Sequence, residues 1–463
     1  MRLRLREGWP FRHPYLLVNG LATEHTNAEG VVCLWREDDT SRAWIRLEGL
    51  YDRLAQWCEK ARNGFAPEDL ALDAYLGFEP REPTLATLDL NSLRPTLGFS
   101  DGQDGAVHGV QRHPLLVDLR PGAGPDGSLA GRWYYRERVS APPRTLDEFR
   151  SVLAAGQRRN FERGAQRCAS DGNNALRLCL LIWRRSRHLD ALVIRLNPKP
   201  GGGVEATSLQ PAPIDEDTLL LRAGPDARQL RGKRVVLFGC GAVGSHAGLV
   251  LAESGIGSLH LVDNDVLRPG NVVRHTGGRE CYGFRKAHVL KHIVEQHAPW
   301  TSVEATVDAP FDPGKIARLI ENTDMVFDAS GNAPFIELVS RVTEDERSRL
   351  ISVALYRGGA IGRVRRQIPG VDRSIYLRAE DSRYFFIPSD EKADATLEIG
   401  CSAPVNNAPP TAVVAVAALA AHVTIDTLLD LRLYPDEVVE VYRPLDRPPF
   451  NRMGRLLPET SSA

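Results

Sequence analysis

The segment RVVLFGCGAVGSHAGLVLAESGIGSLHLVDND, residues 234–265, decides the fold. An apolar run leads into Gly239-x-Gly241-x-x-Gly244, a helical stretch follows, and a second apolar run ends at Asp263. These glycines permit a tight turn, a close approach of the backbone to phosphate and close packing of helix on strand, while the helix N-terminus offers unpaired N–H groups to an anion. A carboxylate at Asp263 is placed to accept hydrogen bonds from ribose hydroxyls. The segment predicts nucleotide binding, and the alternative is a glycine turn that serves packing alone.

The rest of the C-terminal half extends this pattern. From Arg231 onward, short apolar runs alternate with helical patterns, and the runs lie at residues 235–238, 259–262, 303–307, 325–328 and 350–354. This rhythm predicts an α/β fold with a largely parallel, doubly wound Rossmann-like sheet.

Polar residues after the second strand favour the handling of a triphosphate. Asp265, Asn271, Arg274 and Lys286 are an acid, an amide and two cations, spaced so that they can converge beyond the strand ends. Phosphate charge must be neutralised there as pyrophosphate leaves. Asp328 ends the run MVFD, where a carboxylate can hold Mg²⁺ between phosphate oxygens. Taken alone, each of these residues is equally a solvated surface charge or a turn residue.

The chain from Arg231 to about Asn332 resembles the ThiF/MoeB/ubiquitin-activating family. The motifs that carry the resemblance stand in the family's order as Gly239-Cys-Gly241-Ala-Val-Gly244, Asp263-Asn-Asp265, Asn271-Val-Val-Arg274, Gly283-Phe-Arg-Lys286 and Asp328-Ala-Ser-Gly-Asn332. The resemblance implies that ATP and Mg²⁺ adenylate the C-terminal glycine of a ubiquitin-like protein. It also implies a homodimer, in which Arg222, Arg228 or Arg231 acts across the interface.

A cysteine follows these motifs in a loop-like context. Cys401 lies in EIGCSAPVNNAPP, before an Ala-rich helix that is expected to begin near Thr411. A thiolate can capture an acyl-adenylate. In ubiquitin-activating relatives a crossover segment carries the thioester cysteine, and the resemblance implies this role for Cys401. The alternative is a small buried apolar residue.

The N-terminal block resembles the ubiquitin-conjugating fold. The elements that match are Trp9-Pro10-Phe11-Arg12-His13-Pro14, a strand at 15–18, His25-Thr26-Asn27 and Gly30-Val-Val-Cys33-Leu34. The resemblance implies that Cys33 carries a thioester and that the Asn27 amide stabilises the oxyanion when a lysine attacks it. The alternative for Cys33 is a decayed or purely structural cysteine. The first helix and first two strands of that family are expected to be missing, because the chain starts within the strand before these elements.

A helix is expected after Cys33, with an apolar face that places Cys58 in the core. Its residues recur at three- and four-residue spacing, as Leu47, Leu50, Tyr51, Leu54, Trp57 and Cys58.

Turn-rich sequence divides the chain into three parts. We expect a small α+β conjugating-like domain at 1–91, a linker or middle α+β region at 92–228, and the adenylation domain at 229–463. In the middle region, a capping box at Thr145 predicts a helix to about Ala169, and strands are expected at 176–183 and 192–196.

Composition excludes several classes of function. The chain has 463 residues, with 58 Lys and Arg against 59 Asp and Glu, so no positive field favours nucleic acid. The longest apolar run, Ala412 to Ala421, is too short for a membrane span, and no secretory signal opens the chain, so we expect a cytoplasmic protein. The seven cysteines include no CxxC pair, which argues against a structural zinc and against sulfur-transfer relatives.

The order of the parts resembles bacterial fusion proteins of anti-phage CBASS operons. The resemblance implies ligation of the C-terminal glycine of a ubiquitin-like or nucleotidyltransferase protein to a target lysine, through Cys401 and then Cys33. Two alternatives stay open: an adenylyltransferase that activates a sulfur carrier, and a scaffold that binds ATP or NAD without chemistry.

Overall fold

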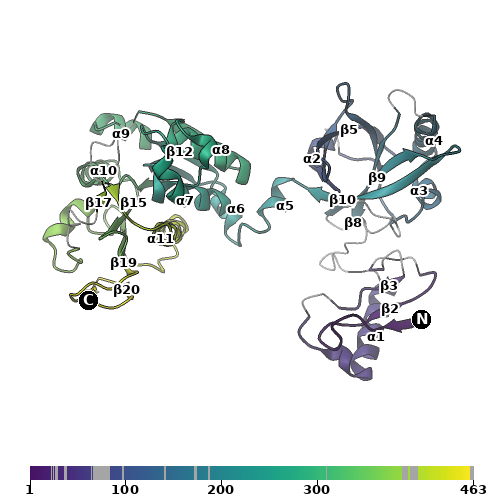
Figure 1. Cartoon of the computed structure of the whole chain (residues 1–463), viewed down its shortest axis with the longest axis horizontal. Coiled ribbons are helices and arrows are strands. Elements are labelled where there is room, and N and C mark those ends of the chain that lie inside the picture. The colour runs from purple at the N-terminus through teal and green to yellow at the C-terminus, as the bar shows by residue number, and fades with distance from the viewer. Residues whose placement is uncertain are drawn as a thin grey trace. The chain divides into compact units, whose positions relative to one another are not determined.

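The chain divides into two compact units, Met1–Thr218 and Leu219–Ala463, in the computed structural model (Figure 1). The structure describes residues 1–21, 23, 25–26, 30–35, 39–63, 65, 84–95, 98–139, 142–170, 175–185, 188–308, 310–387, 395–396 and 405–458.

The first unit begins with a small three-stranded antiparallel sheet and one helix. The strands are β1 (Arg2–Arg4), β2 (Tyr15–Leu17) and β3 (Val31–Val32), and they are followed by the 3₁₀ turn η1 (Ala43–Ile45) and the helix α1 (Leu47–Asn63). Their shared core consists of Leu16, Val32, Leu34, Trp35, Trp44 and Trp57.

The predicted apolar face of α1 is narrower than its sequence indicated. Leu50, Leu54 and Trp57 pack against this core, whereas Tyr51 and Cys58 are exposed. The packed residues follow each other at four- and three-residue intervals and form one stripe, while Tyr51 and Cys58 lie on the neighbouring stripe, which faces solvent. The prediction that Cys58 is a core residue is therefore wrong.

The middle of the chain forms a closed seven-stranded barrel, which the sequence pattern did not predict. The strand order is β10-β4-β6-β5-β7-β8-β9. The strands are β4 (Leu85–Leu88), β5 (Asp104–His113), β6 (Leu116–Pro121), β7 (Leu129–Arg136), β8 (Leu178–Arg185), β9 (His188–Pro198) and β10 (Val204–Pro213), and the short helix α2 (Leu90–Leu93) follows β4. The barrel thus begins before residue 91, because β4 closes it by pairing with β10.

Alternation along the barrel strands builds two cores. In β8, Leu178 and Leu180 point into the barrel, while Cys179 and Leu181 pack on its outside. The outer core is covered by helices α3 (Leu146–Val152) and α4 (Ala155–Ala169). The Thr145 hydroxyl caps α3 as predicted, but the single helix expected there is two helices, because the chain turns extended at Leu153 and Ala154.

The second unit contains an eight-stranded sheet of order β13-β12-β11-β14-β15-β16-β19-β20. The first five strands are parallel, which confirms the predicted Rossmann-like arrangement, and the last three add antiparallel pairs. The strands are β11 (Arg234–Phe238), β12 (Ser258–Val262), β13 (Ser302–Thr306), β14 (Met325–Asp328), β15 (Leu350–Tyr356), β16 (Ile361–Gln367), β19 (Glu437–Val441) and β20 (Gly454–Leu456).

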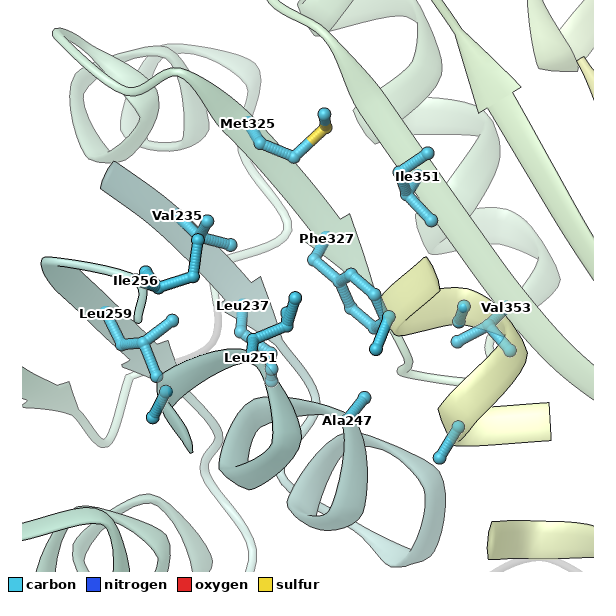
Figure 2. Close-up of a cluster of buried hydrophobic side chains, with 14 of the residues drawn as sticks. Val235, Leu237, Ala247, Leu251, Ile256, Leu259, Met325, Phe327, Ile351 and Val353 are labelled. Carbon is cyan, nitrogen blue, oxygen red and sulfur yellow. The ribbon is translucent and has the colours of Figure 1, made fainter. Parts of the chain in front are cut away.

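Helices cover both faces of this sheet. One face packs against α7 (Ala242–Glu253), α8 (Lys286–His297) and α11 (Pro410–Leu428), and the other against α9 (Pro313–Ile320) and α10 (Ala333–Asp345). Figure 2 shows Leu237, Phe327 and Val353 on the first face, in one cluster with Leu251 of α7. The central strands β11, β14 and β15 thus have apolar residues on both faces, as buried parallel strands require.

Helix α11 is long and apolar enough to cross a membrane, but it packs as a core helix. Two thirds of its most apolar 18-residue stretch is buried, and the helix contacts α7, β15 and β16. A helix that is apolar all round is expected where both of its sides meet protein.

The second unit starts earlier than the predicted residue 229. The helices α5 (Glu216–Leu220) and α6 (Ala227–Leu230) precede β11. Leu230 belongs to the core of the sheet, and the amide of Gly257 donates to its carbonyl at 3.2 Å. These contacts join the segment after residue 219 to the sheet.

Candidate functional site

The site lies where the strand order of the parallel sheet reverses. β11 is flanked by β12 on one side and by β14 on the other, so the connections that leave β11 and β14 diverge. Phe238 and Asp328, the last residues of these two strands, are partners in the register. Open α/β sheets bind ligands beyond the carboxyl ends of the strands at such a switch point.

The three glycines after β11 have different tasks. Gly239 has φ +88°, and a Cβ there would lie 2.8 Å from the Ala329 carbonyl. A Cβ on Gly244 would lie 1.8 Å from the Gly239 carbonyl oxygen, so close packing requires glycine at both positions. A Cβ on Gly241 would meet no atom within 4 Å. Gly241 therefore leaves open space at the N-terminus of α7, where backbone N–H groups attract an anion.

The Asp263 carboxylate holds the glycine loop in place. One oxygen accepts the Cys240 amide at 2.6 Å, and the other accepts the Asp265 amide at 2.7 Å. Burial raises the pKa of Asp263 more than these bonds lower it. Contact with a ribose stays a prediction, since the structure shows only this loop-holding role.

His275 supports the same loop and was missed by the sequence reasoning. Its Nε2 lies 2.9 Å from the Cys240 carbonyl, and its Nδ1 accepts the Gly277 amide at 2.8 Å. Because Nδ1 is an acceptor, the proton resides on Nε2, and burial lowers the pKa of the ring to about 4. The sequence carries no signal for this role beyond the position of His275 directly after Arg274.

Asp265 and Lys286 form an ion pair beside the glycine loop. The Lys286 ammonium lies 2.5 Å from an Asp265 oxygen, and Lys286 is the first residue of α8. Burial by itself raises the pKa of Asp265, but the hydrogen bond and charge of Lys286 outweigh it, and the pKa is lowered. A cation at a helix N-terminus is unfavourable without an anion nearby, and Asp265 supplies that anion here. The ammonium group can also contact a phosphate bound at the neighbouring glycine loop.

Asn271 and Arg274 do not join that pair. The Asn271 side chain accepts the Arg268 amide at 3.1 Å and caps its own 3₁₀ turn, η3 (Pro269–Arg274). The Arg274 guanidinium donates to the Ala408 carbonyl at 3.4 Å. The structure thus brings together two of the four predicted phosphate residues, and a third contacts the segment that leads into α11.

Asp328 is 2% exposed at the end of β14. One of its oxygens accepts the Ser330 hydroxyl at 2.6 Å and the Ser330 amide at 3.1 Å, and the other accepts the Ser352 hydroxyl at 3.1 Å. Burial raises its pKa, and the bonds to the serines offset this only in part.

These residues fit one kind of metal site. Within the described ranges, no three His, Cys, Asp or Glu side chains cluster as metal ligands. Mg²⁺ takes one or two carboxylates and completes its shell with phosphate oxygens and water. Asp328 therefore fits an Mg²⁺ that arrives with a nucleotide, and does not fit a metal held by protein alone.

The predicted thiols differ in what the structure describes. Cys33 is exposed directly after β3, and its amide donates to the His25 carbonyl at 2.9 Å. Asn27 and Cys401 lie outside the described residues. In the sequence, Cys401 falls between β17 (Ala395–Thr396) and β18 (Val405–Asn406), which pair antiparallel. Cys240, in the glycine loop, is fully buried, and burial raises its pKa well above the ordinary range, so it is no nucleophile.

A surface pocket of about 500 Å³ lies at the amino ends of the strands, opposite the carboxyl ends where the switch point is. Lys233, Asp324 and Arg349 line it, and each directly precedes a strand. It is therefore separate from the switch point.

Comparison with known proteins agrees with this geometry. A model of the ThiF family matches residues 216–454, slightly more than half of the chain. The uncharacterized protein y4qC of Sinorhizobium fredii is 37% identical over 150 residues, 30% of this chain and 26% of that protein. The ATP-dependent ubiquitin transferase-like protein Cap2 of Vibrio cholerae is 31% identical over 134 residues, 28% of this chain and 23% of Cap2.

Among solved structures, the crystal structure of E. coli MccB with MccA-N7isoASN covers 46% of this chain and 63% of MccB, with 20% identity and a TM-score of 0.39. The chain matches about a quarter of the length of the two curated relatives.

Proposed function

The chain belongs to the ThiF family, and from this premise we propose that it is an adenylyltransferase that uses ATP to activate a carboxylate. The observation that carries the proposal is the meeting of three features at one switch point. These are the open helix N-terminus at Gly241, the Lys286–Asp265 pair and the Asp328 carboxylate.

In the proposed reaction, a carboxylate oxygen of the substrate attacks the α-phosphorus of ATP. An O–P bond forms, and the bond from the α-phosphorus to the bridging oxygen breaks, so that pyrophosphate leaves with the electron pair. The N-terminus of α7 and Lys286 stabilise the charge that grows on the phosphates. When bound, Mg²⁺ neutralises phosphate oxygens, and Asp328 is the residue that would hold it.

The finer proposal concerns the substrate. We propose that it is the C-terminal glycine of a ubiquitin-like or nucleotidyltransferase protein, in line with the ubiquitin transferase-like relative Cap2. Ala408, which contacts Arg274, is seven residues along the chain from Cys401, so the segment after this thiol contacts a predicted phosphate residue. This contact supports Cys401 as the first acceptor of the acyl group.

The thiol route is then as follows. The Cys401 thiolate attacks the acyl carbon and AMP leaves, and the exposed Cys33 thiolate next displaces Cys401 from the thioester. A lysine amine of the target attacks the Cys33 thioester, an amide forms, and Cys33 leaves as thiolate, with Asn27 as the oxyanion donor. A cytoplasmic homodimer with an anti-phage role completes the proposal.

Pyrophosphate exchange into ATP tests the adenylation step. The chain is expected to exchange labelled pyrophosphate only when a protein with a free C-terminal glycine is present, and Lys286→Ala is expected to abolish exchange. Binding of ATP without exchange, across a panel of ubiquitin-like and nucleotidyltransferase proteins with free C-terminal glycines, would contradict the proposal and favour a scaffold.

The order of the thiols has its own test. A reductant-sensitive adduct with the activated protein is expected to be lost in Cys401→Ala and retained in Cys33→Ala. The reverse pattern would show that Cys33 is loaded first.

A further inference from the structure

A row of polar residues crosses the sheet at the level of the site. Asp328 of β14 is the register partner of Ser352 on β15, Ser352 of Arg365 on β16, and Arg365 of Glu437 on β19. Register partners lie on the same face of a sheet. The Ser352 hydroxyl donates to Asp328 at 3.1 Å and accepts from the Arg365 guanidinium at 3.1 Å. Arg365 thus lies within two hydrogen-bond lengths of the carboxylate that ends β14.

Arg365 differs from the other arginines inside this unit. Arg363 pairs with the fully buried Glu437 at 2.8 Å, Arg366 pairs with Asp372 at 3.0 Å, and Arg378 lies 3.4 Å from an oxygen of Asp436. For Arg365, the described part of the chain offers the Ser352 hydroxyl but no carboxylate within ion-pair distance.

The environment of Arg365 is unfavourable for a lone cation. The residue is partly buried, and burial, followed by the charge of Arg363, lowers the pKa of its guanidinium. Charges removed from water are ordinarily paired, because their desolvation is otherwise uncompensated. Two carboxylates lie near Arg365 without pairing with it: Glu437, its register partner, already pairs with Arg363 at 2.8 Å, and Asp328 is the residue proposed to hold Mg²⁺.

Resting on the proposed function, we infer that Arg365 is the docking residue for the carboxylate of the acyl substrate. The planar guanidinium presents paired N–H donors that match a carboxylate. Held there, the carboxylate lies beside Asp328, at the side of β14 away from the glycine loop.

Strand spacing favours a carboxylate over a phosphate as the missing anion. Neighbouring strands lie about 4.8 Å apart, and β16 is three strands from β11, so the backbone at Arg365 is about 14 Å from the glycine loop. The phosphates are expected between that loop and Asp328, and Arg365 lies on the far side of Asp328 from the loop. An anion at Arg365 therefore approaches from the opposite side of Asp328, as the second reactant must.

The first test is the thermal unfolding of Arg365→Met, with Arg366→Met as the matched control on the same strand. If the partner of Arg365 is a ligand, the unfolding midpoint of Arg365→Met stays equal to wild type or rises, since an unpaired charge is removed. Arg366→Met is expected to lower the midpoint, because it leaves the buried Asp372 carboxylate without its ion-pair partner. If the unfolding midpoint falls as far in Arg365→Met as in Arg366→Met, the inference is overturned and Arg365 has a structural role.

The second test uses two anion probes on the full chain at constant ionic strength. Sodium acetate at several times its Kd is expected to raise the midpoint of wild type by about 2 °C over sodium chloride, and Arg365→Met should lose this rise. Inorganic pyrophosphate should protect both proteins equally. Protection by acetate that is the same in both proteins, or by pyrophosphate that depends on Arg365, would overturn the inference.

These readouts need no adenylation, so they separate the two proposals. If wild type fails to exchange pyrophosphate but shows acetate protection that depends on Arg365, the carboxylate site stands and the adenylation proposal fails. If wild type exchanges pyrophosphate but the Michaelis constant for the acyl protein is unchanged in Arg365→Met, the carboxylate site is refuted while adenylation stands.

Discussion

One methyl group is expected to have opposite consequences at Gly241 and at Gly244. At Gly244 the added carbon would lie 1.8 Å from the Gly239 carbonyl oxygen, so the helix α7 must move away from its loop. Overpacking of this kind costs about 1–3 kcal/mol. In a unit of this size, that cost lowers the unfolding midpoint by about 2–12 °C.

At Gly241 the fold can accommodate the same methyl group without strain. The residue has φ −78°, which any residue adopts, and its added carbon meets no atom within 4 Å. The unfolding free energy of Gly241→Ala should therefore stay within about 0.5 kcal/mol of wild type. The methyl group does occupy the approach to the α7 N-terminus, so we expect nucleotide affinity to fall about tenfold or more, about 1.4 kcal/mol.

Two measurements decide the matter. Circular dichroism gives the unfolding midpoints, and calorimetric titration with Mg²⁺ and a non-hydrolysable ATP analogue gives the affinities. The reasoning is refuted if Gly241→Ala binds the analogue as tightly as wild type, or if Gly244→Ala unfolds within 1 °C of wild type.

Three further predictions concern titratable groups of the site. The pKa of His275 is lowered to about 4, so an unfolded chain takes up this proton first, and up to about 3 kcal/mol of stability is lost as the pH falls from about 6.5 to 4. Chemical denaturation across this range measures the slope, and an equally steep slope in His275→Gln would contradict it. Burial raises the pKa of Asp328, so Asp328→Asn should keep or raise the midpoint at pH 7 while exchange is lost, and a strongly lowered midpoint would refute this. Lys286→Gln removes the ion pair with Asp265 and should weaken the ATP analogue about tenfold in calorimetry, and less at high salt, because charge is lost. An affinity equal to wild type would exclude a phosphate contact.

The local elements around the glycine loop were predictable from sequence. The alternation of apolar runs and helices gave the parallel strands within one or two residues, because buried parallel strands are short, apolar and bounded by turns. The barrel was not predictable in this way. Its strand β4 pairs with β6 and with β10, which begins more than a hundred residues later, and no local pattern encodes such partners.

Sequence by itself determined which residues stand at the switch point: the glycines, Asp263, Lys286 and Asp328 follow in a fixed order beside parallel strands, whose carboxyl ends lie on the same side of the sheet. Only the tertiary structure decided what each side chain does there. The Asn271 side chain caps its own 3₁₀ turn, and His275 hydrogen-bonds to the glycine loop. Arg365 is two strands from Asp328 and distant from it in sequence, yet it lies within two hydrogen bonds of the Asp328 carboxylate. The reason is physical: spacing along the chain fixes which strand end a residue occupies, whereas side-chain partners depend on which strands become neighbours and on how deeply each group is buried.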